Sequence, residues 1–487
     1  RVHYDVAFDD TGKIEAIDFI QLVRCGWSMD LSLPVADRAM LHADNAYLLD
    51  AVRITSHRLR TNTQSATAYR GFGGPQGVLG IERVMDHIAG ALGLDPLAVR
   101  RANYYNAPGH KGRKRTPYGQ KIRDFALHEM TDQLAQSADY AVRVAAIDDW
   151  NARNPVLKRG IALTPVKFGI SFTLTHLNQA GALVHVYQDG SIAMNHGGTE
   201  MGQGLFQKVA QVAASRFGVA LDQVRITATD TGKVPNTSAT AASSGSDLNG
   251  MAVAAACDTI RDRMAQHLAS LHGCAPNDVQ FVDGTVIAGD ARYSFAEAAQ
   301  TAYEARISLS ATGFYKTPKL KWDRARGTGR PFFYFAYGAA CSEVVLDVLT
   351  GEHRILRTDI LHDAGASLNP ALDIGQVEGG FVQGAGWLTM EELVWDTKGR
   401  LRTHAPSTYK IPASDRPAEF NVHLWDGANR EDTVYRSKAV GEPPFMLGMS
   451  ALMALSDAVA ACGDRFPALD APATPERLLA AIEAVRA

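Results

Sequence analysis

Gly197-Gly198-Thr199-Glu200-Met201-Gly202-Gln203-Gly204 is the stretch from which the organisation of this chain can be worked out. It follows an expected β-hairpin at residues 181–195 and precedes an amphipathic helical pattern at residues 205–217. A glycine-rich turn at the start of a helix can direct several backbone N–H groups at one point, which suits an anion or a phosphate-bearing cofactor. A tight turn that binds nothing is the alternative, and it is the more frequent origin of glycines before a helix.

Strand and helix signals on both sides of this turn predict an α+β fold with mainly antiparallel sheets flanked by helices. A first hairpin is expected at residues 2–24, and further hairpin turns at residues 188–190, 349–351 and 396–399. Helices are expected at residues 76–92, 95–104, 246–272, 294–307, 370–393, 444–461 and 474–486.

The length of the chain predicts more than one domain. A chain of 487 residues exceeds one hydrophobic core, so we expect about two to four domains. The polar segment at residues 108–122 is the expected linker between residues 1–107 and residues 123–487. Its basic cluster of Lys111, Arg113, Lys114 and Arg115 is interpreted as a solvated loop rather than a binding patch. The chain begins at Arg1 inside strand-like sequence, which indicates a piece of a longer polypeptide.

Composition argues against several classes of function. The net charge of −3 argues against a nucleic-acid or anionic-membrane partner, and no run of about 18 apolar residues predicts a membrane span. The five cysteines are scattered and contain no C-x-x-C pair, which argues against a disulfide framework, a zinc site or a cysteine-ligated iron–sulfur cluster. Separated histidines likewise argue against a metal held by imidazoles. We therefore expect reduced thiols and a cytoplasmic protein.

Three further segments depart from what packing alone requires. Residues 69–76 place Arg70 and Phe72 among three glycines before a helix, although a buried Phe in a tight turn is an equal alternative. Residues 229–250 are rich in small hydroxyl side chains that let backbone amides approach a ligand, with a flexible linker as the alternative. Glu442 stands between Gly441 and two prolines, which limit its positional freedom. An acid interacting with a helix N-terminus is the alternative for Glu442.

The helix expected at residues 370–393 contains two glutamines that packing alone does not require. Gln376 and Gln383 share one face, which favours a polar ligand, although helix packing explains the neighbouring glycines nearly as well. The chain contains no strand–GxGxxG–helix unit, no GxxxxGK[ST] and no GxSxG motif. These features together favour a large polar cofactor held mostly by backbone.

Five stretches together resemble the molybdenum-binding part of the xanthine dehydrogenase and xanthine oxidase family: residues 70–76, 197–204, 237–250, 373–379 and 441–444. They follow the family's order across nearly the whole chain, and the chain is most similar to the C-terminal half of the separate molybdenum subunit of bacterial members. The resemblance implies an elongated, multi-domain molybdenum-cofactor-binding fold. Residues 1–107 are then the C-terminal part of a first cofactor-binding domain, and residues 123–487 are the second.

The resemblance also implies roles for individual residues. Glu442 matches the family's base, which deprotonates the Mo–OH group, and Arg38 matches the arginine that orients a purine and stabilises charge on it. Phe72 and Phe172 match the aromatic rings that sandwich the substrate. Contacts to molybdopterin are implied at Arg70, Gly71, Phe72, Gly202, Gln203, Ser243, Ser244 and Gln376. No side chain is implied to bind molybdenum directly, because the pterin dithiolene holds it.

The implied activity is oxidation of hypoxanthine and xanthine to urate. In the family, the deprotonated Mo–OH oxygen attacks the purine carbon and hydride passes to Mo=S. A guanidinium near the ring favours the transition state, in which negative charge grows on the purine. Iron–sulfur clusters and FAD are implied only in absent modules or a partner chain, so a hetero-oligomer is expected.

Two other functions stay open. An aldehyde-oxidising molybdenum hydroxylase of the same family is one, although Arg38 argues against it because an aldehyde has less need of a cation. A non-catalytic assembly module without cofactor is the other, and the intact segments 197–204 and 441–443 argue against that reading.

Overall fold

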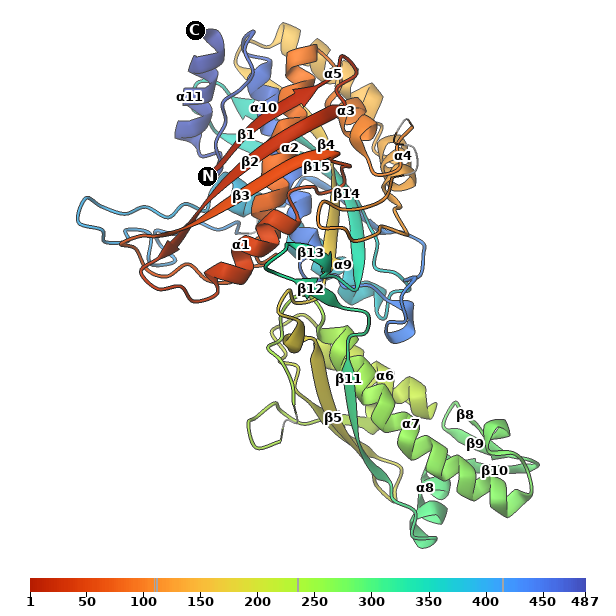
Figure 1. The fold of residues 1–487 in the computed structure, drawn as a ribbon. Helices are drawn as coiled ribbons and strands as arrows, with labels where there is room; N and C mark the ends of the chain where they lie inside the picture. The colour runs from red at the N-terminus through yellow and green to blue at the C-terminus, as the bar shows by residue number, and fades with distance from the viewer. Residues whose placement is uncertain (109, 111–112, 234–235, 414–415) are drawn as a thin grey trace.

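The computed structural model describes residues 1–108, 110, 113–233, 236–413 and 416–487. It is elongated, with a larger body that holds both termini and a smaller body built around β5, β11, α6 and α7 (Figure 1). The fold is α+β, and four of the five sheets in the described residues are wholly or mainly antiparallel, whereas the sheet β1-β2-β3 has one antiparallel and one parallel pairing. The predicted fold class is therefore confirmed.

The larger body is organised on a four-stranded sheet in the order β16-β15-β14-β4. β4 (Leu157–Ile170) and β14 (Tyr334–Asp347) pair antiparallel along their whole length, β15 (His353–His362) pairs antiparallel with β14, and β16 (Glu419–Leu424) adds a parallel edge. β4 and β14 are buried on both faces, because alternate side chains of each strand enter two different cores.

Helices cover both faces of this sheet. Ile161 and Leu163 of β4 pack with α4 (Leu127–Ser137), whereas Ala162 and Val166 pack with α10 (Met449–Ala460). The alternation follows from the two-residue period of a strand. Three further helices of this body are α5 (Tyr140–Arg153), α9 (Pro370–Thr389) and α11 (Pro475–Arg486).

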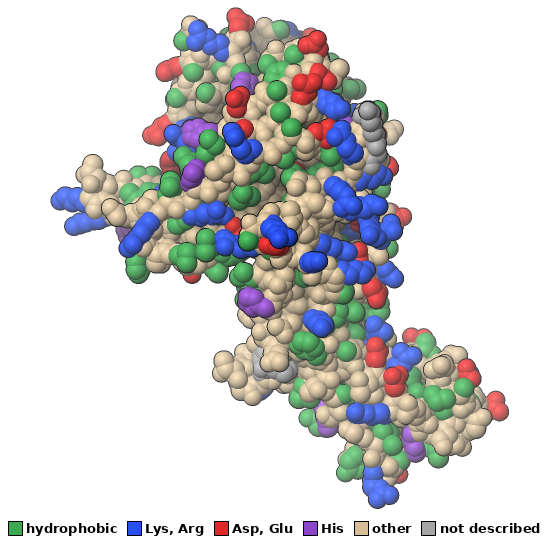
Figure 2. Space-filling view, viewed as in Figure 1, with side chains coloured by type: hydrophobic (Ala, Val, Ile, Leu, Met, Phe, Trp, Pro, Cys, Tyr) green, Lys and Arg blue, Asp and Glu red, His purple; other side chains and the backbone are tan. Residues whose placement is uncertain are grey.

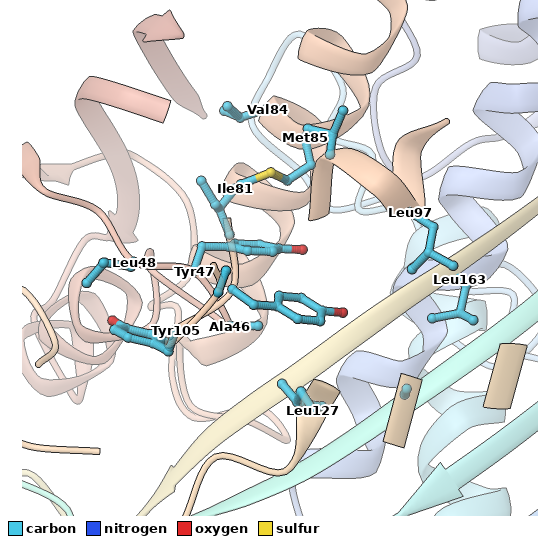
Figure 3. Close-up of a cluster of buried hydrophobic side chains, with 14 of the residues drawn as sticks. Ala46, Tyr47, Leu48, Ile81, Val84, Met85, Leu97, Tyr105, Leu127 and Leu163 are labelled. Atoms are coloured by element: carbon cyan, nitrogen blue, oxygen red, sulfur yellow. The ribbon is translucent and has the colours of Figure 1, made fainter. Parts of the chain in front are cut away.

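The N-terminal part of the chain adds a three-stranded sheet in the order β1-β2-β3. Its strands are β1 (Val2–Phe8), β2 (Ile14–Gly26) and β3 (Ala51–Arg60), and its helices are α1 (Ser32–Leu41), α2 (Gly74–Leu92) and α3 (Pro96–Asn103). Figure 3 shows the core that joins this part to the central sheet, with Ile81 and Met85 of α2 near Tyr47 and with Leu163 of β4. Hydrogen bonds from Arg38 to the carbonyl of Gly169 and from the Gly169 N–H to His42 join the end of α1 to the end of β4.

The smaller body has a four-stranded sheet in the order β11-β5-β6-β7, covered by two helices. Its elements are β5 (Gln179–Val186), β6 (Ile192–His196), β7 (Val224–Ile226), β11 (Ser310–Lys316), α6 (Leu205–Phe217) and α7 (Gly245–His272). A small sheet of β8 (Gln280–Val282), β9 (Thr285–Ala288) and β10 (Ala291–Ser294) lies at its far end beside α8 (Phe295–Glu304) (Figure 1). β12 (Lys321–Asp323) and β13 (Thr328–Arg330) form a separate hairpin.

Most predicted elements are present, with differences at their ends. Three expected hairpins form, but the turn at residues 396–399 supports only an isolated bridge between Trp395 and Leu401. The helix expected at residues 444–461 is divided into a 3₁₀ segment, η5 (Pro443–Gly448), and α10. Within the described residues, Pro443–Ala460 alone has the length and apolar character of a membrane span, and 89% of it is buried inside the protein.

The segment predicted as a linker is packed against the fold. Tyr118, Gln120 and Ile122 are buried, and the Gln120 side chain exchanges hydrogen bonds with the backbone of Phe332. Lys111 of the basic cluster lies outside the described residues. The domain boundaries at residues 107 and 123 stay predictions.

Candidate active site

Segments from five places in the sequence line one cavity of about 630 Å³. They come from the turn before α2, the start of α6, the start of α7, the region leading into and along α9, and the segment before η5. The cavity brings together Phe72, Gln203, Ser243, Gln376 and Glu442. Backbone turns and polar side chains from distant parts of the chain therefore meet at one place, which makes this cavity the candidate active site.

Glu442 is a buried carboxylate that Ser243 holds in place. The Ser243 hydroxyl donates to Oε2 of Glu442 at 2.8 Å and accepts from the backbone N–H of Glu442 at 2.7 Å. Ala242 and Ser243 both have a φ of +56°, in the left-handed region that non-glycine residues adopt at some energetic cost. The strained backbone aims the Ser243 hydroxyl at the carboxylate.

Arg38 lies behind Glu442, outside the cavity lining. Its guanidinium is buried, donates to the backbone carbonyls of Gly169 and Ser171, and lies 4.0 Å from Oε2 of Glu442. It also lies over the Phe168 ring at 4.5 Å from the ring centre. Burial lowers the pKa of Arg38, and the Glu442 carboxylate acts in the opposite direction. The arrangement balances the charge of a buried carboxylate; the role of Arg38 toward a purine stays a prediction.

Arg70 ties three walls of the cavity together. Its Nε donates to the carbonyl of Gly441 at 2.6 Å, and its other nitrogens donate to the Gln383 side chain at 3.1 Å and to the carbonyl of Gln376 at 3.3 Å. The face shared by Gln376 and Gln383 therefore meets a cation. Burial lowers the pKa of Arg70, opposed by the charge of Glu442.

The backbone N–H groups of the glycine-rich turn at residues 197–204 bind a carboxylate of the same turn. The backbone N–H groups of Gly202, Gly204 and Phe206 donate to the carboxylate of Glu200 at 2.8, 3.0 and 3.0 Å. Burial would raise the pKa of Glu200, but these N–H groups outweigh it and lower the pKa. An internal carboxylate thus takes the place of an external anion, and this part of the hypothesis is wrong.

The other predicted contacts lie on the lining or next to it. Phe72 and Gln203 line the cavity, and the Gln203 amide donates to the carbonyl of Thr199 at 2.9 Å. Gly71, Gly202 and Ser244 are each sequence neighbours of lining residues without lining the cavity themselves.

Phe172 is buried and does not line the cavity. Its backbone N–H donates to the side chain of Asn178 at 2.8 Å. The predicted sandwich of a substrate ring between Phe72 and Phe172 therefore stays a prediction.

Two charged groups in the cavity were not predicted from the sequence. Lys208 of α6 forms an ion pair with Asp373 of α9. Asp247 of α7 accepts a hydrogen bond from the Tyr334 hydroxyl at 2.7 Å, and burial raises the pKa of Asp247 to about 7. The signal for Lys208 was present in the sequence, because this lysine falls on the apolar face of its helix.

The lining residues fit a molybdopterin. The polar edge of a pterin needs both donors and acceptors, and Arg70 and Lys208 can donate while Gln203 and Gln376 can do both. Phe72, Leu368 and Val440 add apolar walls for the flat ring system. The volume lies within the range of about 300–1,000 Å³ that is usual for small-molecule sites. Within the described residues no group of three or more His, Cys, Asp or Glu side chains is placed to hold a metal ion.

Comparisons with known proteins agree with this fit. Residues 133–416 match a family model described as a molybdopterin cofactor-binding domain, and residues 1–104 match a second model with the same description. The first match alone covers more than half of the chain. The predicted molybdopterin cofactor is confirmed by these matches.

Similarity to individual proteins covers almost the whole chain. The chain is 45% identical over 481 residues to the xanthine dehydrogenase/oxidase of Gallus gallus and 46% identical over 484 residues to that of Mus musculus. It is 45% identical over 489 residues to the xanthine dehydrogenase of Oryza sativa subsp. japonica. Each alignment covers 98% of this chain and 34% of the relative, so the chain spans about a third of the length of these relatives. The bacterial type stays a prediction, because these relatives are from animals and a plant.

Solved structures share the fold. Quinoline 2-oxidoreductase from Pseudomonas putida 86 superposes with a TM-score of 0.86 at 23% identity, covering 99% of this chain and 61% of that chain. The aldehyde oxidoreductase from Desulfovibrio desulfuricans superposes with a TM-score of 0.80 at 23% identity, covering 99% of this chain and 48% of that chain. On the family matches and on this architecture, the chain belongs to the molybdopterin cofactor-binding domain family and is similar throughout to the corresponding part of the xanthine dehydrogenases.

Proposed function

We propose that this chain is the molybdenum-cofactor part of a molybdenum hydroxylase that oxidises hypoxanthine and xanthine to urate. The observation that carries the proposal is the cavity-facing Glu442, fixed by Ser243 and backed by the buried guanidinium of Arg38 at 4.0 Å. Similarity to the xanthine dehydrogenases supports the purine assignment.

Glu442 is the proton acceptor in this proposal. Its Oε2 accepts from Ser243 and faces Arg38, whereas no hydrogen bond from the described residues reaches Oε1. Oε1 is therefore the oxygen that can take a proton. Molybdopterin, when bound, supplies the two-electron oxidation and the oxygen transfer.

The surrounding side chains orient the reactants. Phe72 presents an aromatic face on the cavity wall for a flat heterocycle. Arg38 places a positive charge near the site where negative charge grows on a purine during the reaction, which favours the transition state over the ground state. Arg70, Gln203 and Gln376 would hold the pterin through their polar groups.

The base is tested by Glu442→Gln in the holoenzyme. The amide keeps the shape but cannot accept the proton, so we expect kcat to fall by about 10²–10⁴-fold, with molybdenum and pterin content unchanged. Glu304→Gln, at the exposed end of α8, is the matched control and is expected to behave as wild type. Unchanged kcat in Glu442→Gln would refute the assignment.

The substrate is tested by steady-state assays of the holoenzyme with hypoxanthine, xanthine and a simple aldehyde. We expect a higher kcat/KM for the purines. An aldehyde preference would instead establish the aldehyde-oxidising alternative, and a careful elemental analysis without molybdenum would favour the non-catalytic assembly module.

We further propose that electrons leave through iron–sulfur clusters and FAD in other modules or a partner chain, within a cytoplasmic hetero-oligomer. The scattered cysteines of this chain support a separate location for the clusters. Size measurement of the native complex, combined with its absorption spectrum, tests the association. A native particle that lacks the flavin and iron–sulfur absorption would refute it.

A further inference from the structure

A short hairpin between α3 and α4 concentrates positive charge that the proposed function does not use. Arg115 and Lys121 form an antiparallel bridge, and Ile122 donates through its backbone N–H to the carbonyl of Lys114 at 2.7 Å. Thr116 and Gln120 close the turn with a backbone hydrogen bond of 3.0 Å. The segment, called the ribbon below, is thus a hydrogen-bonded turn around one isolated bridge, with its basic side chains exposed to solvent.

Alternation along this ribbon separates its two faces. Thr116, Gln120 and Ile122 point into the core, where the Gln120 side chain is bonded to the backbone of Phe332 at 2.9 and 3.2 Å. The period of two therefore turns the other set outward. That exposed set consists of Arg113, Arg115, Lys121 and Arg123.

The outward face brings like charges together. Arg115 lies opposite Lys121, and the same register sets Arg113 opposite Arg123. Like charges directly across an antiparallel pair destabilise it. Arg113 is paired with Asp50 at 2.6 Å, but among the described residues no carboxylate lies within ion-pair distance of Arg115, Lys121 or Arg123. The protein as a whole carries a net charge of only −3, so this is a local excess of cations.

Nearby carboxylates are engaged elsewhere. Asp124 faces Lys438 at 3.4 Å, and Glu431 is shared between Lys319 at 2.6 Å and Arg330 at 2.8 Å. These acids are therefore held by other cations and do not neutralise the ribbon.

The cations border two adjoining hollows of about 1040 and 310 Å³. Arg115, Lys121, Arg123 and Arg430 line both. Lys114 and Asp50, the partner of Arg113, line the larger one, and Asp124 and Glu431, which are paired with other cations, line the smaller one. In Figure 2, Lys and Arg side chains gather along the right-hand side of the larger body. The larger hollow slightly exceeds the upper end of the range of about 300–1,000 Å³ that is usual for small-molecule sites, and the smaller one lies at its lower end.

We propose that this hollow binds a compact anion that carries two or more linked phosphate groups. Guanidinium groups bind phosphate oxygens through paired hydrogen bonds, and neighbouring cations on both strands of a ribbon can share one polyphosphate. A compact group of cations in a hollow favours such an anion over an acidic polypeptide, which needs charges spread along a strand or helix. The proposal is independent of the function of the molybdopterin cavity.

The test is calorimetric titration of the holoenzyme with inorganic pyrophosphate, inorganic triphosphate, ADP and AMP. We expect saturable binding to one site per chain, with triphosphate and pyrophosphate stronger than AMP and with weaker binding at higher salt. ADP stronger than pyrophosphate would identify a nucleotide as the source of the phosphates, and equal affinities would identify the free polyphosphate.

The double variant Arg115→Gln with Lys121→Gln locates the site. We expect its affinity for pyrophosphate to fall at least about tenfold, because charge-assisted hydrogen bonds are lost. Arg292→Gln, an exposed arginine on β10 of the smaller body, is the matched control and should bind as wild type. The unfolding midpoint of the double variant should not fall, since a repulsive pair is removed.

Two results would overturn the proposal. One is the absence of saturable pyrophosphate binding to the wild-type holoenzyme at low salt. The other is equal pyrophosphate affinity in the wild type and in the folded double variant, which would place the anion elsewhere.

Discussion

Ser243 and Glu442 hold each other through two hydrogen bonds, although they stand 199 residues apart in the sequence. Ser243 belongs to the segment that opens α7 in the smaller body, whereas Glu442 precedes η5 in the larger body. The carboxylate is therefore oriented only when the two bodies are assembled. The left-handed φ of +56° at Ser243 shows that the backbone is strained to reach this contact.

Removing the Ser243 hydroxyl should reduce turnover more than substrate binding. A hydrogen bond to a charged group is worth about 1.5–3 kcal/mol, so Ser243→Ala is expected to lower kcat of the holoenzyme by about 10–100-fold with little change in KM. Ser238→Ala is the control from the same segment, because its hydroxyl bonds only the backbone of Gln179 at 3.0 Å, away from Glu442. A wild-type kcat in Ser243→Ala would show that Glu442 needs no such support.

The stability of the protein should fall as pH rises through the range in which Asp247 titrates. Burial raises the pKa of Asp247 from 3.8 to about 7, so the folded state binds a proton that the unfolded state releases. The stabilising contribution of protonated Asp247 to the free energy of unfolding is complete below about pH 4 and is lost by about pH 7. Its upper magnitude is on the order of 4 kcal/mol.

Asp247→Asn isolates this effect. The amide keeps an acceptor for the Tyr334 hydroxyl but does not titrate, so the variant should gain stability relative to wild type between pH 4 and pH 7. Unfolding free energies measured at several pH values check the prediction. Asp457, whose pKa burial also raises to about 7, remains in both proteins and cancels in the difference.

Glu200 should act on stability in the opposite pH range. The backbone N–H groups of its turn lower its pKa below 4.5, so its stabilising contribution is present above pH 4.5 and is lost as pH falls through the lower, folded-state pKa. Glu200→Ala removes an acceptor from three N–H groups and is expected to cost about 1 kcal/mol at pH 7, as other lost caps do. Thermal unfolding at pH 7 and pH 3 measures it.

The control for Glu200 is Glu129→Ala, an exposed acid in the first turn of α4. It should change the unfolding midpoint little at either pH. A Glu200→Ala defect that does not shrink as pH falls below 4.5 would contradict an electrostatic role, because protonation of the wild-type carboxyl removes its charge.

The sequence predicted those parts of the site that depend on local turn chemistry. Glycines, prolines and hydroxyl residues marked the turns before α2, α6 and α7, and each of these turns reaches the cavity. The position of Glu442 between Gly441 and Pro443 also indicated a fixed carboxylate.

Local sequence signals of this kind do not predict contacts between residues that are far apart in the chain. The turn at Glu200 contains its own anion, which only the curvature of the loop reveals. Arg38 is placed by the carbonyls at the end of β4, a strand that starts more than 100 residues later and was not predicted. α5 was missed because it buries only Tyr140 and Ile147, too few to give a helical pattern.

Two glycines of α9 should respond in opposite directions to alanine. A Cβ at Gly384 would come within 1.9 Å of the carbonyl of Phe445 in η5, whereas a Cβ at Gly379 would meet nothing within 4 Å. Gly384→Ala must therefore push η5, and Glu442 before it, away from α9, at a cost of about 1–3 kcal/mol and with a loss of kcat. Gly379→Ala should stabilise the helix by about 0.5–1 kcal/mol and leave kcat unchanged. Unfolding free energies and kcat of both holoenzymes are the measurements. Equal effects of the two substitutions would mean that the close approach of α9 to η5 does not position the carboxylate.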